Sequence, residues 1–99
     1  MNMEKINIEV LHEGEHWIPC VYMARVVEAV APDYGEALLV RKVVTKEMEG
    51  AMRFGELSKE LGRPAPVPSI FINGELVFDQ TPSMEELRDY LDRFLGKSG

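Results

Sequence analysis

The sequence predicts an α/β sandwich in which helices flank a mixed four-stranded sheet, with the element order βαβαββα. Segments with the period of a strand alternate with segments with the period of a helix. Near the C-terminal end an Asn-Gly pair joins two apolar runs, and a capped amphipathic segment follows them. The chain has 99 residues, 45% of them hydrophobic, which is enough for one core and too few for two. We therefore expect one domain over residues 1–99.

The first two elements follow from a change of period. Ile6, Ile8 and Val10 alternate with polar residues, which predicts a strand over residues 5–11 with one buried face. The segment 12–16 interrupts this alternation. Apolar residues then recur at helical spacing over residues 19–31, a segment that opens with proline, which suits the first position of a helix. We expect a strand, a loop and a helix in that order.

The second strand is expected over residues 37–44, after turn chemistry at 32–35. Its residues are apolar on both faces, which is typical of a strand that helices cover on both sides. The sequence therefore predicts that this strand is interior and parallel to the first one.

The second helix is well defined only in its second half. Thr45 can cap a helix, but Gly50 and Gly55 weaken one, so residues 46–53 are left open between helix and loop. A stripe of three apolar residues predicts a helix that ends near Gly62; these residues are Phe54, Leu57 and Leu61.

The C-terminal third carries the strongest local signals. Three prolines exclude a helix over residues 63–68. Asn73-Gly74 tolerates the positive φ values of a tight turn, and it predicts a hairpin of strands at 69–72 and 75–79. Ser83 opens a capping box, and the apolar stripe behind it predicts a third helix that ends at Gly96.

Composition excludes several classes of function. The formal net charge of −6 and the lack of a basic cluster argue against nucleic acid and membrane surfaces as partners. The chain begins without the apolar segment of a signal peptide, so we expect a cytoplasmic protein.

No metal site is expected from His12, His16 and Cys20, because Gly14 and Pro19 break any helix that would align them. A single cysteine excludes an intramolecular disulfide.

Two motifs carry a resemblance to a known family. One is Trp17-Ile18-Pro19-Cys20 at the start of the first helix, and the other is the run from Val67-Pro68 to Phe78. With the element order, they make almost the whole chain resemble the thioredoxin and glutaredoxin superfamily. The resemblance implies that Pro68 is a cis-proline and that Cys20 matches the second cysteine of a C-x-x-C motif. Trp17 then stands where the first, attacking cysteine is expected.

The chain departs from the family in two respects. Loss of the attacking cysteine excludes ordinary dithiol activity, because no second sulfur exists to close an internal disulfide. Pro66 stands where glutaredoxins usually carry threonine, and the residues that hold glutathione are not evident after the hairpin. No cofactor is therefore expected. The tryptophan codon is one base from the cysteine codons and from the codon that can specify selenocysteine, so Trp17 can also mark a lost redox residue.

The sequence leaves two functions open. In the first, Cys20 performs monothiol exchange with protein thiols or a small thiol, because a thiol in the first turn of a helix is activated by the helix N-terminus. In the second, the chain is a redox-inactive binding module, and Cys20 packs as a small apolar residue. In both, Trp17, Ile18, Pro19 and the Val67-Pro68 loop are expected to form a groove, although Trp17 and Ile18 can equally close over the core. The sequence does not indicate an oligomeric state.

Overall fold

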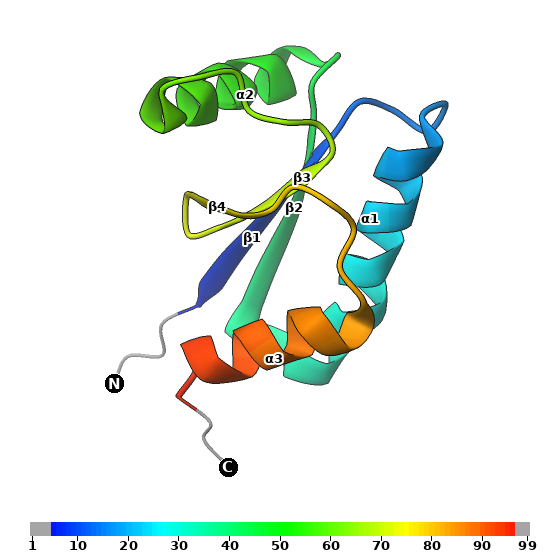
Figure 1. The fold of residues 1–99 in the computed structure, drawn as a ribbon, viewed down its shortest axis with the longest axis vertical. Helices are drawn as coiled ribbons and strands as arrows, with labels where there is room; N and C mark the ends of the chain where they lie inside the picture. The colour runs from blue at the N-terminus through cyan, green and yellow to red at the C-terminus, as the bar shows by residue number, and fades with distance from the viewer. Residues whose placement is uncertain (1–4, 97–99) are drawn as a thin grey trace.

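Four strands form one mixed sheet in the computed structural model, which describes residues 5–96 (Figure 1). The strand order is β2-β1-β3-β4. Strand β1 (Ile6–His12) is parallel to β2 (Leu38–Val44) and antiparallel to β3 (Ser69–Ile72), which pairs antiparallel with β4 (Glu75–Phe78). The predicted sandwich with a mixed four-stranded sheet is confirmed.

The helices cover the two faces of the sheet unequally. Helices α1 (Ile18–Val30) and α3 (Met84–Phe94) lie on one face, and α2 (Met48–Leu61) lies on the other (Figure 1). A short 3₁₀ segment, η1 (Ala31–Ala37), joins α1 to β2 where the sequence predicts a turn. The bounds of the first strand and the first helix differ from the predicted ones by a single residue at each end, which is the usual uncertainty of element ends.

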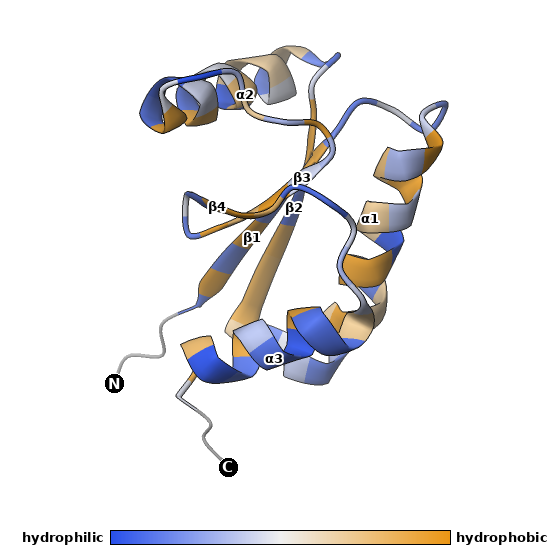
Figure 2. Cartoon of the chain, viewed as in Figure 1, coloured by the Kyte–Doolittle hydropathy of each residue, from blue (hydrophilic) through white to orange (hydrophobic). Residues whose placement is uncertain are grey.

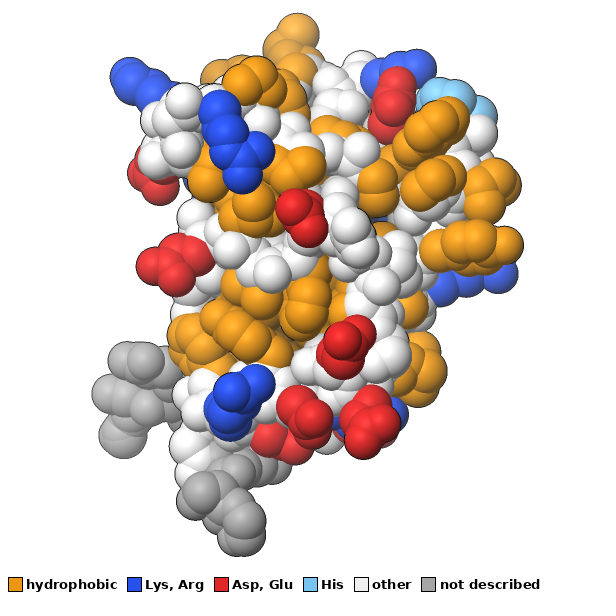
Figure 3. All heavy atoms as spheres, in the orientation of Figure 1, with side chains coloured by type: hydrophobic (Ala, Val, Ile, Leu, Met, Phe, Trp, Pro, Cys, Tyr) orange, Lys and Arg blue, Asp and Glu red, His pale blue; other side chains and the backbone are white. Residues whose placement is uncertain are grey.

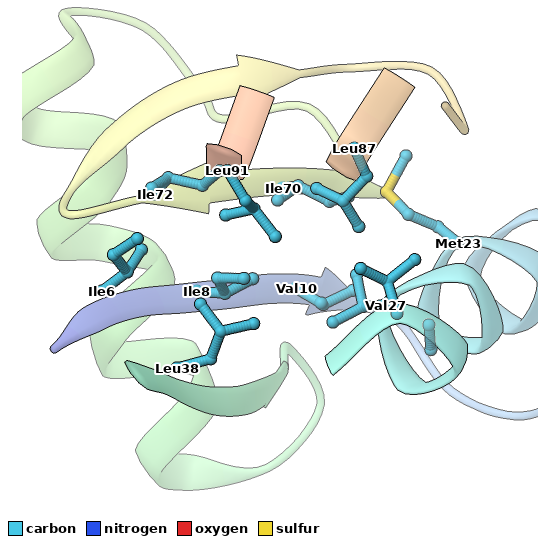
Figure 4. Packing of buried hydrophobic residues seen from close by; sticks show 12 residues of the cluster. Ile6, Ile8, Val10, Met23, Val27, Leu38, Ile70, Ile72, Leu87 and Leu91 are labelled. Atoms are coloured by element: carbon cyan, nitrogen blue, oxygen red, sulfur yellow. The ribbon is translucent and has the colours of Figure 1, made fainter. Parts of the chain in front are cut away.

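Two hydrophobic cores result from this layering. The alternation of β1 sends Ile6, Ile8 and Val10 toward α1 and α3, and sends Leu11 toward α2. Figure 2 shows that the strands are largely hydrophobic, whereas α3 is mostly hydrophilic along its visible side. The larger core contains side chains from the sheet, α1 and α3 (Figure 4): Ile6, Ile8, Val10, Met23, Ala24, Val27, Val30, Leu38, Ile70, Ile72, Leu87 and Leu91. The smaller core, under α2, contains Leu11, Val43, Leu57, Ala65 and Phe71.

The position predicted for the second strand is wrong. Strand β2 is parallel to β1 as expected, but it lies at the edge of the sheet. Leu39 and Val40 are 54% and 40% exposed, so neither face of the strand is fully covered. Arg41 and Lys42 are exposed in its centre, and charged residues at such positions are a common protection of edge strands. The apolar run reflects strand propensity here rather than burial on both faces.

Helix α2 begins earlier than the apolar stripe indicates. It is continuous from Met48, with Glu47 rather than Thr45 at its N-cap, and it includes both glycines. The Thr45 N–H donates instead to the carbonyl of His12, at 2.9 Å. The predicted end is confirmed, because Gly62 stops the helix in a left-handed conformation with φ of 83°.

The local predictions for the C-terminal third are confirmed. Asn73 and Gly74 have φ values of 52° and 85°, as the tight hairpin turn requires. The side chain of Ser83 accepts the Glu86 N–H at 3.0 Å, and the Glu86 carboxylate accepts the Ser83 N–H at 2.8 Å. This reciprocal pair starts α3, which ends at Phe94, two residues before Gly96.

The expectation of a cytoplasmic location concerns the start of the chain. The expectation drawn from the start of the sequence falls on residues 1–4, which lie outside the described residues. Within residues 5–96, no helix combines the length and the apolar character that crossing a membrane requires.

Candidate functional site

Trp17 stands at the mouth of α1. It is the N-cap residue, with extended backbone angles, and its carbonyl accepts the N–H groups of Cys20 and Val21 at 3.0 and 3.2 Å. Its own N–H donates to the carbonyl of Gly14 at 3.1 Å, which fixes the loop that leads into the helix. Pro19 lies in the first turn, where its missing N–H leaves no hydrogen bond unmade. The Trp17 side chain is 46% exposed and caps nothing.

Cys20 lies on the inner side of the same helical turn. Its residue is 0% exposed, and it points toward the sheet with Met23, Ala24 and Val27. The sulfur accepts the N–H of Glu13, just beyond the end of β1, with an N···Sγ distance of 3.3 Å. The thiol is therefore shielded in the folded protein, as the packing interpretation of the sequence expects.

The loop before β3 approaches the same end of β1. Ser69 pairs with Leu11, so Pro68 lies beside the last residues of that strand. The peptide bond between Val67 and Pro68 is cis. Ser69 Oγ donates to the carbonyl of Pro66 at 2.7 Å, which holds the loop at its C-terminal end.

The end of β1 thus connects the two halves of the predicted site. The N–H of Glu13 contacts Cys20 on one side. On the other side, Leu11 pairs with Ser69, the residue after Pro68. Ile18, next to Trp17, is 54% exposed, and Val67 is partly buried. At this site two exposed apolar residues, Trp17 and Ile18, precede a fully buried thiol at Cys20.

His12, which the sequence offered only as a rejected metal ligand, lies between these two contacts. It is 1% exposed, and among residues 5–96 neither ring nitrogen has a hydrogen-bond partner. Burial lowers the pKa of His12 below its usual value of 6.5, and the charge of Lys42 lowers it further. The signal was present in the alternation of Ile8 and Val10, which places His12 on the same inward face, but the predicted strand ended at residue 11 and left His12 in the loop.

His16 does not share this buried position. It is exposed, and its Nε2 atom lies 3.3 Å from Nζ of Lys46. The neighbouring acids form surface ion pairs, Glu13 with Lys46 at 3.7 Å and Glu15 with Lys42 at 3.4 Å. No group of three or more potential ligands among the described residues could hold a metal ion.

The burial of His12 predicts a pH dependence of stability. Because its pKa is lowered in the folded state, the unfolded chain binds the proton more readily than the folded one below about pH 6.5. The free energy of unfolding should therefore fall as the pH drops through this range, by at most about 1.4 kcal/mol per pH unit for one proton. Urea unfolding between neutral pH and pH 5 measures it.

His12→Leu and His16→Gln form the matched pair for this experiment. The His12 variant should lose most of the pH dependence above pH 5, whereas the variant of exposed His16 should keep it. Equal pH dependence in wild type and His12→Leu would contradict the assignment.

Solved thioredoxins share this arrangement of elements. Thioredoxin-2 of a malaria parasite aligns with a TM-score of 0.67 and 13% identity, over 90% of this chain and 82% of its own. Thioredoxin O2 from Arabidopsis thaliana aligns with a TM-score of 0.67 and 14% identity, over 91% and 75%. The thioredoxin Deadhead from Drosophila melanogaster gives 0.63 and 16%, over 91% and 81%. No family model and no curated protein matches the sequence.

The likeness covers nine-tenths of the chain, and at these identities it concerns the fold. The chain has a thioredoxin-like fold. Because folds do not carry function by themselves, the chemistry has to be argued from the site.

Proposed function

We propose that this chain is a thioredoxin-like binding module, which holds an extended segment of a partner protein against Trp17, Ile18 and the Val67–Pro68 loop. The observation that carries the proposal is a contrast in exposure. Cys20 is 0% exposed, whereas Trp17 and Ile18 are 46% and 54% exposed. A thiolate that attacks a disulfide must reach the partner's sulfur, and a sealed thiol does not.

The loop supplies the second half of the groove. Val67 and the cis-bonded Pro68 directly precede β3, and this loop lies beside the end of β1. An extended segment can add strand-like hydrogen bonds at such a place, while an aromatic anchor supplies most of the affinity. Trp17 is the natural anchor because it is large, rigid and already half exposed.

Monothiol exchange is the second candidate, and the Glu13 contact favours it. An N–H that donates to Sγ in the first turn of a helix stabilises a thiolate. In this case Cys20 would attack a partner disulfide, form a mixed disulfide and release the other partner sulfur as a thiol. An external thiol would then have to attack the mixed disulfide and free Cys20. This route needs an opening motion that uncovers Cys20.

The idea that position 17 once held a redox residue has a direct check. A cysteine or selenocysteine codon at position 17 of the native gene would support it, and an ordinary tryptophan codon would end it.

Selection from a phage library of random peptides tests the binding module. Peptides selected on the Cys20→Ser protein should bind wild type with equal affinity and bind Trp17→Ala at least about 10-fold more weakly, as expected for loss of an aromatic anchor. Met48→Ala is the control, because Met48 is 80% exposed on α2, whereas Trp17 belongs to the start of α1 on the other face of the sheet. Failure to select any Trp17-dependent peptide, or capture of partners only through a disulfide to Cys20, would overturn the proposal.

A further inference from the structure

An apolar patch lies where α3 crosses the outer strand β4. The ring of Phe78 meets that of Tyr90 edge-on, with centroids 6.1 Å apart, and Tyr90 lies 6.1 Å from Phe94. Phe94 is 47% exposed, and Val77, Phe78 and Tyr90 are partly exposed beside it. We name these four residues the α3–β4 patch. Figure 3 shows hydrophobic side chains gathered over this part of the surface, with charged side chains around them.

We infer that the α3–β4 patch is the interface of a homodimer, in which it packs on the same patch of a second copy. The first argument is that the patch is apolar and lies at an open edge. Strand β4 pairs only with β3, so no element of residues 5–96 covers its outer side. Aromatic side chains at the centre of a patch with a polar rim are typical of protein–protein interfaces.

The second argument is the order of charges along α3. Glu86, Asp89, Tyr90 and Arg93 follow one another at helical spacing, and together with β4 they line the shallow hollows of the patch. Glu86 lies in the first turn of the helix, Asp89 lies at its middle, and Arg93 lies in its last turn. Neither Asp89 nor Arg93 makes an ion pair within the described part of the chain. Both charges are therefore available to a partner.

A two-fold axis makes each charge pair occur twice. Asp89 and Arg93 are separated by about 6 Å along the helix, at 1.5 Å per residue. An axis level with their midpoint, one residue after Tyr90, sets two α3 helices antiparallel with Tyr90 of each copy close to the axis. Arg93 of one copy then faces Asp89 of the other, and the symmetric contact repeats the match.

Two charge-reversed variants test the dimer, first each alone and then mixed with one another. Sedimentation equilibrium of the full chain should show a dimer, and Arg93→Glu or Asp89→Arg alone should weaken it by about 100-fold or more, since each repulsive contact occurs twice. An equimolar mixture of these two variants should restore the dimer, because both charge pairs are attractive in the heterodimer. Lys59→Glu is the control, since it makes the same change of charge as Arg93→Glu on α2, in the opposite layer.

Three results would overturn the inference. The wild type could remain monomeric at up to about 1 mM protein, which is the weak end of measurable association. The dimer could persist in Arg93→Glu, or the mixture of the two variants could stay monomeric. Because all of these measurements concern mass alone, they are independent of peptide binding at Trp17.

Discussion

Gly50→Ala is expected to destabilise the protein by about 3 kcal/mol or more, one of the two largest effects of a single substitution that the structure predicts. Gly50 is buried in the first turn of α2, directly against the end of β2. A Cβ atom added there would lie 1.8 Å from the carbonyl oxygen of Val44 and 2.5 Å from its carbonyl carbon. Because these are backbone atoms, relief requires α2 to move away from the sheet. Urea denaturation measures the loss.

Gly55→Ala is the matched control on the same helix. A Cβ atom at Gly55 meets no atom within 4 Å, so only helix propensity changes. This substitution should stabilise the protein by about 0.5–1 kcal/mol. Similar effects of the two substitutions, in either direction, would contradict the close packing of α2 on β2.

Separating Glu9 from Arg53 is expected to cost about 2–4 kcal/mol. The Glu9 side chain is 7% exposed on the central strand β1, and it accepts two hydrogen bonds from Arg53 of α2. The distances are 2.7 Å from Nε to Oε2 and 2.9 Å from Nη2 to Oε1. Removal of Arg53 leaves the buried Glu9 carboxylate with only the 3.6 Å contact to Arg41. Removal of Glu9 leaves Arg53 with Glu56, at 2.9 Å, and its 29% exposure allows water to offset part of the loss.

A double-mutant cycle isolates this pair. Of Arg53→Met and Glu9→Leu, Arg53→Met should be the more destabilising single substitution, because it leaves the carboxylate of Glu9 buried without its two hydrogen bonds. The double variant should be far closer to wild type than Arg53→Met, because no buried charge remains in it. Arg41 contacts Glu9 only at 3.6 Å and is 56% exposed, so Arg41→Met should have a small effect. Additive losses from the two single substitutions would contradict a coupled buried pair.

Sequence alone predicted the parts of the fold that depend on local chemistry. The Asn73-Gly74 turn and the capping box at Ser83 each need only a few neighbouring residues, and both are present. The parallel pairing of the first two strands followed from the helix between them. These features need no knowledge of which segments meet in space.

The predictions that were wrong or incomplete concern features that depend on contacts between residues far apart in the sequence. Most of residues 37–44 are apolar, and within this segment only Arg41 and Lys42 in its centre indicate an edge strand. Alternation placed Glu9 on the polar side of β1, but its burial depends on Arg53, which is 44 residues away. The continuous start of α2 likewise depends on Gly50 meeting the backbone of Val44.

The candidate site shows the same division. Its location at Trp17, Cys20 and Pro68 could be read from motifs, and the structure brings the second and third of these to the same end of β1. The sequence left the depth of Cys20 open between two interpretations, because it depends on how α1 packs against the sheet, and the alternation that places His12 inward was not followed past Leu11.

The labelling rate of Cys20 in the folded protein tests the central claim most directly. We expect a thiol reagent to label native Cys20 at least about 100-fold more slowly than the denaturant-unfolded chain, because the sulfur becomes accessible only when the structure opens. Met48→Cys in a Cys20→Ser background gives the reference rate of an exposed thiol in the same fold. If native Cys20 reacts as fast as that reference, the thiol is open to partners, and monothiol exchange replaces the binding module as the function of this site.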